Sequence, residues 1–306
     1  MTATRTLRIG TRASALARIQ TQTVAEALQV PVEIVPIVTD GDRSAAAITE
    51  LGGTGVFVSA LRTALLADEI DVAVHSYKDL PTAPTEGVVI AAVPPREDPR
   101  DALVASGGRT LAELPSGSQV GTGAPRRTAQ LRALGLGLEV VPVRGNVDTR
   151  LRKVTDGSLA AVVLALAGLR RLGRADEATE VLDPIQVLPA PAQGALAVEC
   201  RASDSATFAL LAGLDDADTR AAVTAERALL AALEAGCSAP VAALAEVAEG
   251  DLGPEVFLRG SVTALDGSDA VRLSATGPTT DAEGVGRRLA AELLADGADK
   301  MMGSST

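Results

Sequence analysis

The sequence is poor in aromatic residues, histidine and cysteine. Its 306 residues include no Trp, one Tyr, three Phe, one His and two Cys. So few aromatic rings argue against recognition by base stacking, as in single-strand nucleic-acid binders. The single histidine, His75, argues against multi-histidine metal sites and Ser-His-Asp triads. The two cysteines, Cys200 and Cys237, form neither a disulfide framework nor a metal-binding CxxC pair.

Long apolar runs are also missing. The longest, at 159–169, has 11 residues, whereas a membrane-spanning helix needs about 20. The first 18 residues contain arginines but no apolar stretch typical of a signal peptide. We therefore expect a cytoplasmic protein without a membrane partner. The net charge of −11 opposes broad binding to nucleic-acid phosphates, so no nucleic-acid partner is expected either.

The remaining composition is that of a globular chain. It is 47% hydrophobic and 22% charged, which is enough apolar material for a core. Strand-like and helix-like stretches alternate through the first two thirds, which predicts parallel sheets covered by helices. From about residue 216 the pattern changes to a long helix (219–235), three strand candidates and a last helix from about 281.

Two proline-rich segments, PPREDPR (94–100) and LPAPAQG (188–194), are interpreted as linkers, since proline is poor in helices and central strands. They predict an α/β fold of two hinged lobes, like those of periplasmic binding proteins, with a ligand cleft between them. A small α+β C-terminal domain completes the chain. The expected boundaries are 1–94 plus 195–212 for lobe 1, 100–188 for lobe 2 and 216–306 for the third domain.

Positive charge is concentrated in one stretch. Residues 121–171 contain nine Arg or Lys and three Asp or Glu, a net +6, so the rest of the chain is −17. A basic patch in an acidic protein suggests a small polyanionic ligand. Surface salt bridges on helices explain any single arginine as well.

Three basic turns each follow a strand and open a helix: GTRAS (10–14), GTGAPRR (121–127) and RGNVDTR (144–150). The first turn of a helix has free N–H groups and a positive dipole end, which attract anions. Arginine adds a bidentate grip on carboxylates. Ligands of open α/β sheets lie beyond the carboxyl ends of strands. Together the turns predict a carboxylate-rich ligand, although ordinary helix capping would explain any one of them.

A fourth strand end, IDVAVHSYKDLP (70–81), presents Ser76, Lys78 and Asp79. Only three of the 28 basic residues are lysines, which makes Lys78 a candidate functional residue. Asp79 can remain ionised beside a cation, or act as an acid if buried; an ordinary turn residue is the alternative. We expect His75 and Cys200 to be packed core residues. Cys237, in the LEAGCSAP loop, could carry a covalent group or be structural.

These residues together resemble the porphobilinogen deaminase (hydroxymethylbilane synthase) family. Seven markers carry the resemblance, in order, between about residues 7 and 294: RIGTRAS, AVHSYKDLP, PREDPRDAL, GTGAPRR, VRGNVDTRL, LPAPAQGALAVECR and LEAGCSAPV. Any one of them is weak, but seven in order are highly specific.

The resemblance implies a transferase of tetrapyrrole and haem biosynthesis. Such an enzyme condenses four porphobilinogen molecules head to tail, releases ammonia each time and forms linear hydroxymethylbilane. It implies a dipyrromethane cofactor attached through a thioether to Cys237, with Asp79 as the catalytic residue. Asp79 would assist loss of ammonia and stabilise positive charge on a pyrrole nitrogen. It implies no metal, and we expect a monomer.

The resemblance also assigns binding residues. The positions matching cofactor binding are Ser76, Lys78, Thr122, Arg126, Arg127, Arg144, Arg150 and Gln193. Those matching substrate binding are Arg12, Ser14 and Arg171. The sequence departs from the family pattern at Thr54, where lysine is frequent, and at Gly123 and Ala124, where serines are frequent.

Two alternatives stay open. A two-lobed carboxylate-binding receptor or sensor module would explain the lobes and the arginines, but not the third domain or the Cys237 loop. A cysteine-nucleophile transferase would need a base near Cys237. The polar, glycine-rich segment 41–55 is interpreted as a mobile lid.

Overall fold

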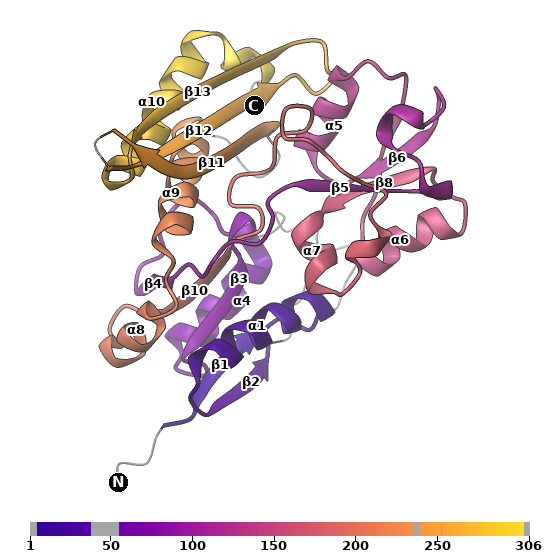
Figure 1. Cartoon of the computed structure of the whole chain (residues 1–306). Coiled ribbons are helices and arrows are strands. Elements are labelled where there is room, and N and C mark those ends of the chain that lie inside the picture. Colours follow the sequence, from indigo (N-terminus) through magenta and orange to yellow (C-terminus); the bar gives the residue numbers. More distant parts are fainter. Residues whose placement is uncertain (1–4, 38–54, 235–238, 252, 303–306) are drawn as a thin grey trace. The chain divides into compact units, whose positions relative to one another are not determined.

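The computed structural model describes residues 5–37, 55–234, 239–251 and 253–302 (Figure 1). The predicted lid at 41–55 therefore lies almost wholly outside the described residues, as do Thr54 and Cys237. The described residues form two compact units. Unit 1 comprises Met1–Arg96 with Ala195–Arg220, and unit 2 comprises Glu97–Gly194 with Ala221–Thr306. The division into three domains at the expected boundaries stays a prediction.

Unit 1 is built on a five-stranded sheet in the order β2-β1-β3-β10-β4. Its core joins apolar strand residues such as Ile9 and Val198 to Val24 of a covering helix. The strands are β1 (Leu7–Thr11), β2 (Val32–Pro36), β3 (Val72–Ser76), β4 (Val88–Ala92) and β10 (Leu196–Arg201). The helices are α1 (Ala15–Leu28), α4 (Gly55–Leu66) and α8 (Ser205–Ala212).

Unit 2 contains a second five-stranded sheet in the order β7-β6-β8-β5-β9. Its two faces bury separate apolar clusters, one around Leu103 and one around Leu151. The strands are β5 (Asp101–Ala105), β6 (Gln119–Thr122), β7 (Glu139–Pro142), β8 (Ala161–Ala165) and β9 (Glu180–Val181). The helices are α5 (Pro125–Ala133), α6 (Val147–Thr155) and α7 (Leu166–Arg171).

The C-terminal part is a three-stranded antiparallel sheet with two helices, orange to yellow in Figure 1. The strands are β11 (Val241–Gly250), β12 (Gly253–Thr263) and β13 (Ala270–Pro278), and the helices are α9 (Ala217–Ala232) and α10 (Ala282–Ala295). Leu229 of α9 and Leu289 of α10 both pack over Gly260 of β12, so both helices cover the same face. The predicted fold class, two α/β sheets with a small α+β C-terminal domain, is confirmed.

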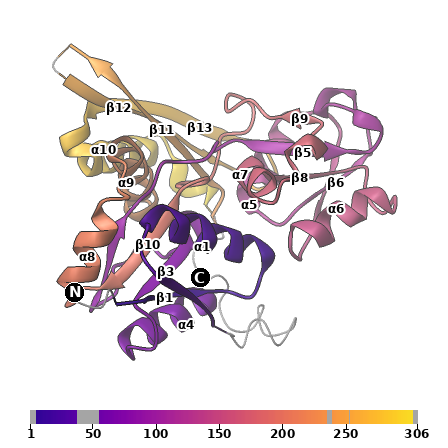
Figure 2. The same ribbon diagram turned by 60° about the horizontal axis from the view of Figure 1, so that its bottom comes forward.

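The prediction of parallel sheets is wrong for one strand of each five-stranded sheet. In each five-stranded sheet four strands run in one direction, and one inner strand is antiparallel to both of its neighbours. The antiparallel strands are β5 and β10, each of which directly follows a proline-rich segment (seen also in Figure 2). Two strands joined by a βαβ crossover lie parallel in the sheet. A strand that is connected in another way can run antiparallel to its neighbours.

The two proline-rich segments are without helix or strand, as predicted, and they touch each other within unit 2. The Glu97 N–H donates to the carbonyl of Gly194 at 3.3 Å. Gly194 has φ +90°, and a Cβ built there would lie 2.2 Å from the Glu97 carbonyl oxygen. Only glycine meets both the left-handed conformation and the close approach.

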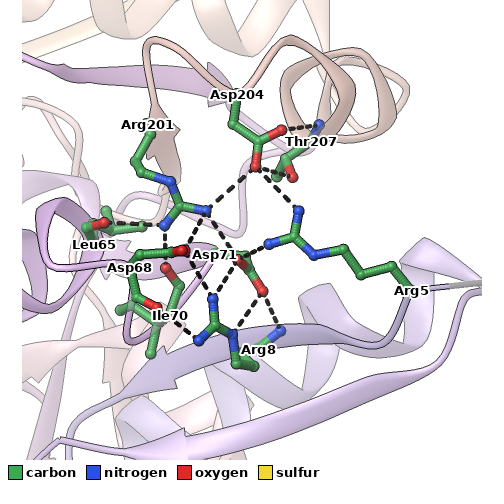
Figure 3. A network of polar contacts seen from close by, with 9 residues as sticks. All are labelled: Arg5, Arg8, Leu65, Asp68, Ile70, Asp71, Arg201, Asp204 and Thr207. Carbon is green, nitrogen blue, oxygen red and sulfur yellow. Dashed lines mark hydrogen bonds and ion pairs between the residues drawn. The ribbon is translucent and has the colours of Figure 1, made fainter.

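An ionic network ties together the edge of the unit 1 sheet where β1 and β3 begin (Figure 3). The Asp71 carboxylate, with a fully buried side chain, pairs with Arg5, Arg8 and Arg201. Burial alone would raise the pKa of Asp71, but hydrogen bonds from Arg8 and Arg201 and the charge of Arg5 hold it well below its usual range. Asp68 and Asp204 also contact these arginines, so the network has three cations and three anions.

A second buried carboxylate lies inside the unit 1 sheet. Nη2 of Arg62, on α4, lies 2.6 Å from Oε1 of Glu199, on β10. Nε2 of His75 lies 3.2 Å from Oε2 of the same carboxylate. Burial alone would raise the pKa of Glu199, but His75 and Arg62 lower it from 4.5 to about 2. His75 is 6% exposed, which confirms its prediction as a packed core residue.

The interactions of Glu199 with Arg62 and His75 predict that the stability of unit 1 falls at acid pH. In the unfolded chain the carboxyl protonates near pH 4.5, so its stabilisation is present above that pH and is lost as pH falls toward 2. The loss is on the order of 3 kcal/mol, at roughly 1.4 kcal/mol per pKa unit. Glu199→Gln should be less stable at pH 6 and should lose less stability between pH 6 and 3.5 in urea unfolding. Glu33→Gln, at an exposed position of β2, is the control. An unchanged dependence of stability on pH in Glu199→Gln would contradict the assignment.

Candidate functional site

Each of the three basic turns lies between a strand and a helix, as predicted. The turn at 10–14 joins β1 to α1, that at 121–127 joins β6 to α5, and that at 144–150 joins β7 to α6. Pro125 is the first residue of α5, where its missing N–H costs nothing. The Ser14 and Asn146 side chains accept N–H bonds from Ala17 at 3.3 Å and Thr149 at 2.9 Å. Both side chains therefore cap the helices that follow them.

In unit 1 the predicted site residues gather at one edge of the sheet. β1 and β3 are adjacent and parallel, pairing Ile9 with Val72, so their carboxyl ends lie side by side. Arg12 and Ser14 follow the first of these strands. Ser76, Lys78 and Asp79 end the second, the last two in a 3₁₀ turn at Tyr77–Asp79.

The side chains of this edge are half-buried. Ser76 Oγ accepts a 2.8 Å hydrogen bond from Gln20 of α1, which fixes the hydroxyl against the helix. The Ser14 hydroxyl accepts the hydrogen bond that caps the start of α1. Gly10 of β1 allows close packing against Ile70, because a Cβ there would lie 2.4 Å from Ile70 Cδ1. This edge therefore presents a guanidinium, an ammonium and a carboxylate from two adjacent strand ends.

In unit 2 the structure brings together Arg126, Arg127 and Gln193 around one residue that the sequence did not single out, Asp101. Arg126 Nη2 lies 2.8 Å from Oδ2 of Asp101, and Arg127 Nη2 lies 2.7 Å from Oδ1. Gln193 Nε2 donates to the same Oδ1 at 2.7 Å. All four residues are at most 5% exposed.

The electrostatics of this cluster are strongly coupled. Burial alone would raise the pKa of Asp101, but Arg126 and Arg127 hold it well below its usual range. Burial lowers the pKa of Arg126, and Asp101 opposes that effect. Burial and the neighbouring charge of Arg127 also lower the pKa of Arg150. Positive charge here exceeds what Asp101 balances, which suits an anionic ligand.

The other predicted residues of unit 2 lie outside the Asp101 cluster and differ in burial. Arg144 is exposed, and Arg150 donates from Nε to the Gly145 carbonyl at 2.8 Å. Arg171 donates to the Gly194 carbonyl at 2.6 Å, and burial lowers its pKa. The hydroxyl of buried Thr122 accepts the Ala124 N–H at 3.3 Å.

The glycine at 123, where the family often has serine, is explained by the close approach of a neighbouring backbone. A Cβ built at Gly123 would lie 2.7 Å from the Val143 carbonyl oxygen, too close for serine without a backbone shift. Ala124 contributes no hydroxyl to the start of α5.

Two carboxylates of unit 2 were missed by sequence reasoning. Asp101 stands in the PREDPRDAL marker, and its available signal was an acid at the start of a wholly apolar strand. Glu226, on α9, is fully buried and accepts the N–H groups of Ala192 at 2.5 Å and Ala245 at 2.7 Å. Nothing in its local sequence distinguishes it from a surface helix acid.

The described part of the chain shows neither a metal cluster nor a membrane helix. Among these residues no group of three or more His, Cys, Asp or Glu is placed to hold a metal ion. None of the helices found in them combines the length and apolarity needed to span a bilayer.

Comparison with protein families matches both parts of the chain. Residues 7–209 match the model described as "Porphobilinogen deaminase, dipyromethane cofactor binding domain". Residues 220–295 match the model described as "Porphobilinogen deaminase, C-terminal domain".

Curated relatives agree with the family models. The chain is 61% identical over 304 residues to a porphobilinogen deaminase of Mycobacterium tuberculosis (strain H37Ra), covering 97% of this chain and 98% of that one. It is 60% identical to one of Nocardia farcinica, covering 97% and 88%. Among solved structures, a putative methionine-binding lipoprotein of Bacillus subtilis superposes with TM-score 0.41 and 11% identity, covering 68% of this chain and 89% of that one.

The two cysteines should differ in reactivity. Cys200 is fully buried, and burial raises its pKa from 9.0 to about 11, which confirms the prediction of a core thiol. At pH 8 that shift alone lowers the thiolate fraction about 100-fold. In a Cys237→Ser variant, where Cys200 is the remaining thiol, reaction with an aromatic disulfide reagent should be slow in native protein and fast in urea. Rapid native labelling would contradict a buried thiol.

Proposed function

The chain belongs to the porphobilinogen deaminase family, and from that premise we propose how its own residues carry out the family's reaction. The observation that carries the proposal is the match of both family domains across the chain, with 60–61% identity to curated deaminases. The enzyme is a transferase that condenses four porphobilinogen molecules into hydroxymethylbilane and releases ammonia at each condensation.

The substrate's chemistry explains the distribution of charge. Each porphobilinogen carries an acetate and a propionate, so the growing chain accumulates carboxylates. The +6 stretch at 121–171 supplies the cations for them. In this proposal Arg126, Arg127 and Gln193 bind the cofactor. The other cofactor-binding positions are Ser76, Lys78, Thr122, Arg144 and Arg150. Arg12, Ser14 and Arg171 contact the substrate.

The residues present fit a dipyrromethane. Arg126 and Arg127 are buried with one shared counter-carboxylate, and the Nε atoms of both are buried without a hydrogen-bond partner within the described residues. A carboxylate-bearing group would supply the missing negative charge and acceptors. When bound, the dipyrromethane would supply the free α-carbon to which the first porphobilinogen unit is joined. We propose that it is attached to Cys237, which lies outside the described residues.

Asp79 is proposed as the catalytic residue. A carboxyl group can pass a proton to the departing amine of porphobilinogen, and as a carboxylate it can face the positive charge left on the pyrrole nitrogen. The 3₁₀ turn after β3 holds it beside Lys78, at the sheet edge that Arg12 shares.

We further propose a cytoplasmic monomer that needs neither metal, nucleic acid nor membrane. The receptor alternative is less well supported, because the family match extends through the C-terminal domain that a two-lobed receptor does not need.

The covalent cofactor can be tested by mass. Intact wild-type protein should exceed the mass of its sequence by two pyrrole units. Cys237→Ser should have the unmodified mass, and the matched Cys200→Ser variant should keep the adduct. Loss of the adduct in Cys200→Ser with retention in Cys237→Ser would reverse the assignment.

The role of Asp79 can be tested by turnover. Asp79→Asn preserves shape but removes the charge and the exchangeable proton, and should lower kcat at least about 10²-fold. Asp79→Glu displaces the carboxylate and should retain more activity than Asn. Rates are compared on protein shown by mass to carry the cofactor. Asp176→Asn, in another 3₁₀ turn, is the control. Near-wild-type turnover of Asp79→Asn would leave Asp79 as a turn residue.

A further inference from the structure

Asp101 occupies a position that the family assignment of roles leaves unexplained. It is the first residue of β5 and is fully buried. Its two oxygens receive three side chains from two distant segments, Arg126 and Arg127 from α5 and Gln193 from the second proline-rich segment. The Gln193 amide also donates to the Pro99 carbonyl at 2.7 Å, two residues before Asp101.

Consecutive arginines on a helix point about 100° apart, so they do not converge without an anchor. Asp101 supplies that anchor through one oxygen for each guanidinium. The second amino group of each arginine is fixed to backbone, Arg126 to the Leu188 carbonyl at 2.5 Å and Arg127 to the Val163 carbonyl at 3.2 Å. Each planar guanidinium is therefore held by at least two acceptors, which sets its plane, and its Nε atom has no hydrogen-bond partner among the described residues.

The charge of the cluster distinguishes it from a purely structural one. Two guanidiniums share one carboxylate, an excess of one positive charge in a buried setting. The Asp71 network of unit 1 has three arginines and three carboxylates, and is neutral (Figure 3). Buried charge is costly unless it is paired. In the part of the chain that the structure describes, no second carboxylate pairs with these two arginines, which indicates a cluster completed by an anion from outside the chain.

We propose that Asp101 is a positioning residue, which presents Arg126, Arg127 and Gln193 as one preset receptor for carboxylates. This inference rests on the proposed function and deepens it, since it assigns what orients the cofactor-binding arginines. Asp101 touches no reacting atom; it acts through the residues that it holds. Its charge keeps two like-charged side chains together, and its geometry fixes where they point.

The test compares Asp101→Asn with Asp71→Asn. Both remove the charge of a fully buried carboxylate that pairs with arginines, so both should lower the melting temperature. Activity is measured with porphobilinogen on holoenzyme confirmed by mass, well below either melting temperature. Asp101→Asn should lower kcat/KM at least about 10-fold, the usual cost of removing a group that orients a ligand-binding residue. It should also shift the distribution of enzyme-bound pyrrole intermediates. Asp71→Asn should keep kcat/KM within about 2-fold of the wild type.

Asp101→Glu is the second variant, and it decides the matter if Asp101→Asn does not fold. It keeps the charge but moves the carboxylate by one methylene group. A positioning role predicts that Asp101→Glu regains thermal stability relative to Asn yet keeps a lowered kcat/KM. Wild-type kcat/KM in Asp101→Glu would reduce Asp101 to a counter-charge and overturn the inference.

Two further outcomes also overturn it. One is a melting temperature loss in Asp101→Asn with unchanged kcat/KM, and the other is an equal loss of kcat/KM in Asp71→Asn. Failure of the proposed function would look different, because the wild type itself would lack the pyrrole adduct and would not consume porphobilinogen.

Discussion

The arrangement of unit 2 depends on one buried carboxylate with two cationic partners. Asp101 stands where the chain leaves the first proline-rich segment and enters β5, and Gln193 stands where the second segment ends. Their hydrogen bond, with the Glu97–Gly194 backbone contact, fixes both segments against each other. Because neither segment forms a helix or a strand, tertiary hydrogen bonds such as these hold its backbone.

The same carboxylate reconciles two opposing requirements. A ligand rich in carboxylates needs arginines, and arginines give their strongest grip where water is excluded. Burying two adjacent cations without a partner would destabilise the fold. One aspartate between them lowers that cost while leaving an excess positive charge. A second aspartate would make the cluster as neutral as the Asp71 network and would remove its attraction for an anion.

Much of the fold could be predicted because the signals are local. Alternating apolar and helical periods located the strands and helices, and Ser14, Pro125 and Asn146 marked helix starts by their capping chemistry. The direction of β5 and β10 could not be predicted in this way, because it depends on how a strand arrives and not on its own residues.

The candidate site could be predicted where a single residue is recognisable by its type and its position in the sequence. Arginines at strand-to-helix turns and a rare lysine at 78 are visible in the sequence. Pairings are not, since Asp101 and Arg126 are separated by 25 residues and meet only in the folded sheet. Ser14 shows that a predicted binding residue can also have a local structural role. Its hydroxyl, predicted to contact substrate, caps its own helix.

A last connection joins the C-terminal domain to this cluster. Glu226 of α9 holds the N–H of Ala192, which has a left-handed φ of +59° that a non-glycine residue adopts only when its surroundings enforce it. The other Glu226 oxygen holds Ala245 of β11, so one carboxylate binds a helix, a sheet and the segment that carries Gln193. Along the sequence, α9 is also the helix that precedes the Cys237 loop. The helix leading to the proposed attachment cysteine is therefore bonded through Glu226 to Ala192, which directly precedes Gln193 of the arginine cluster.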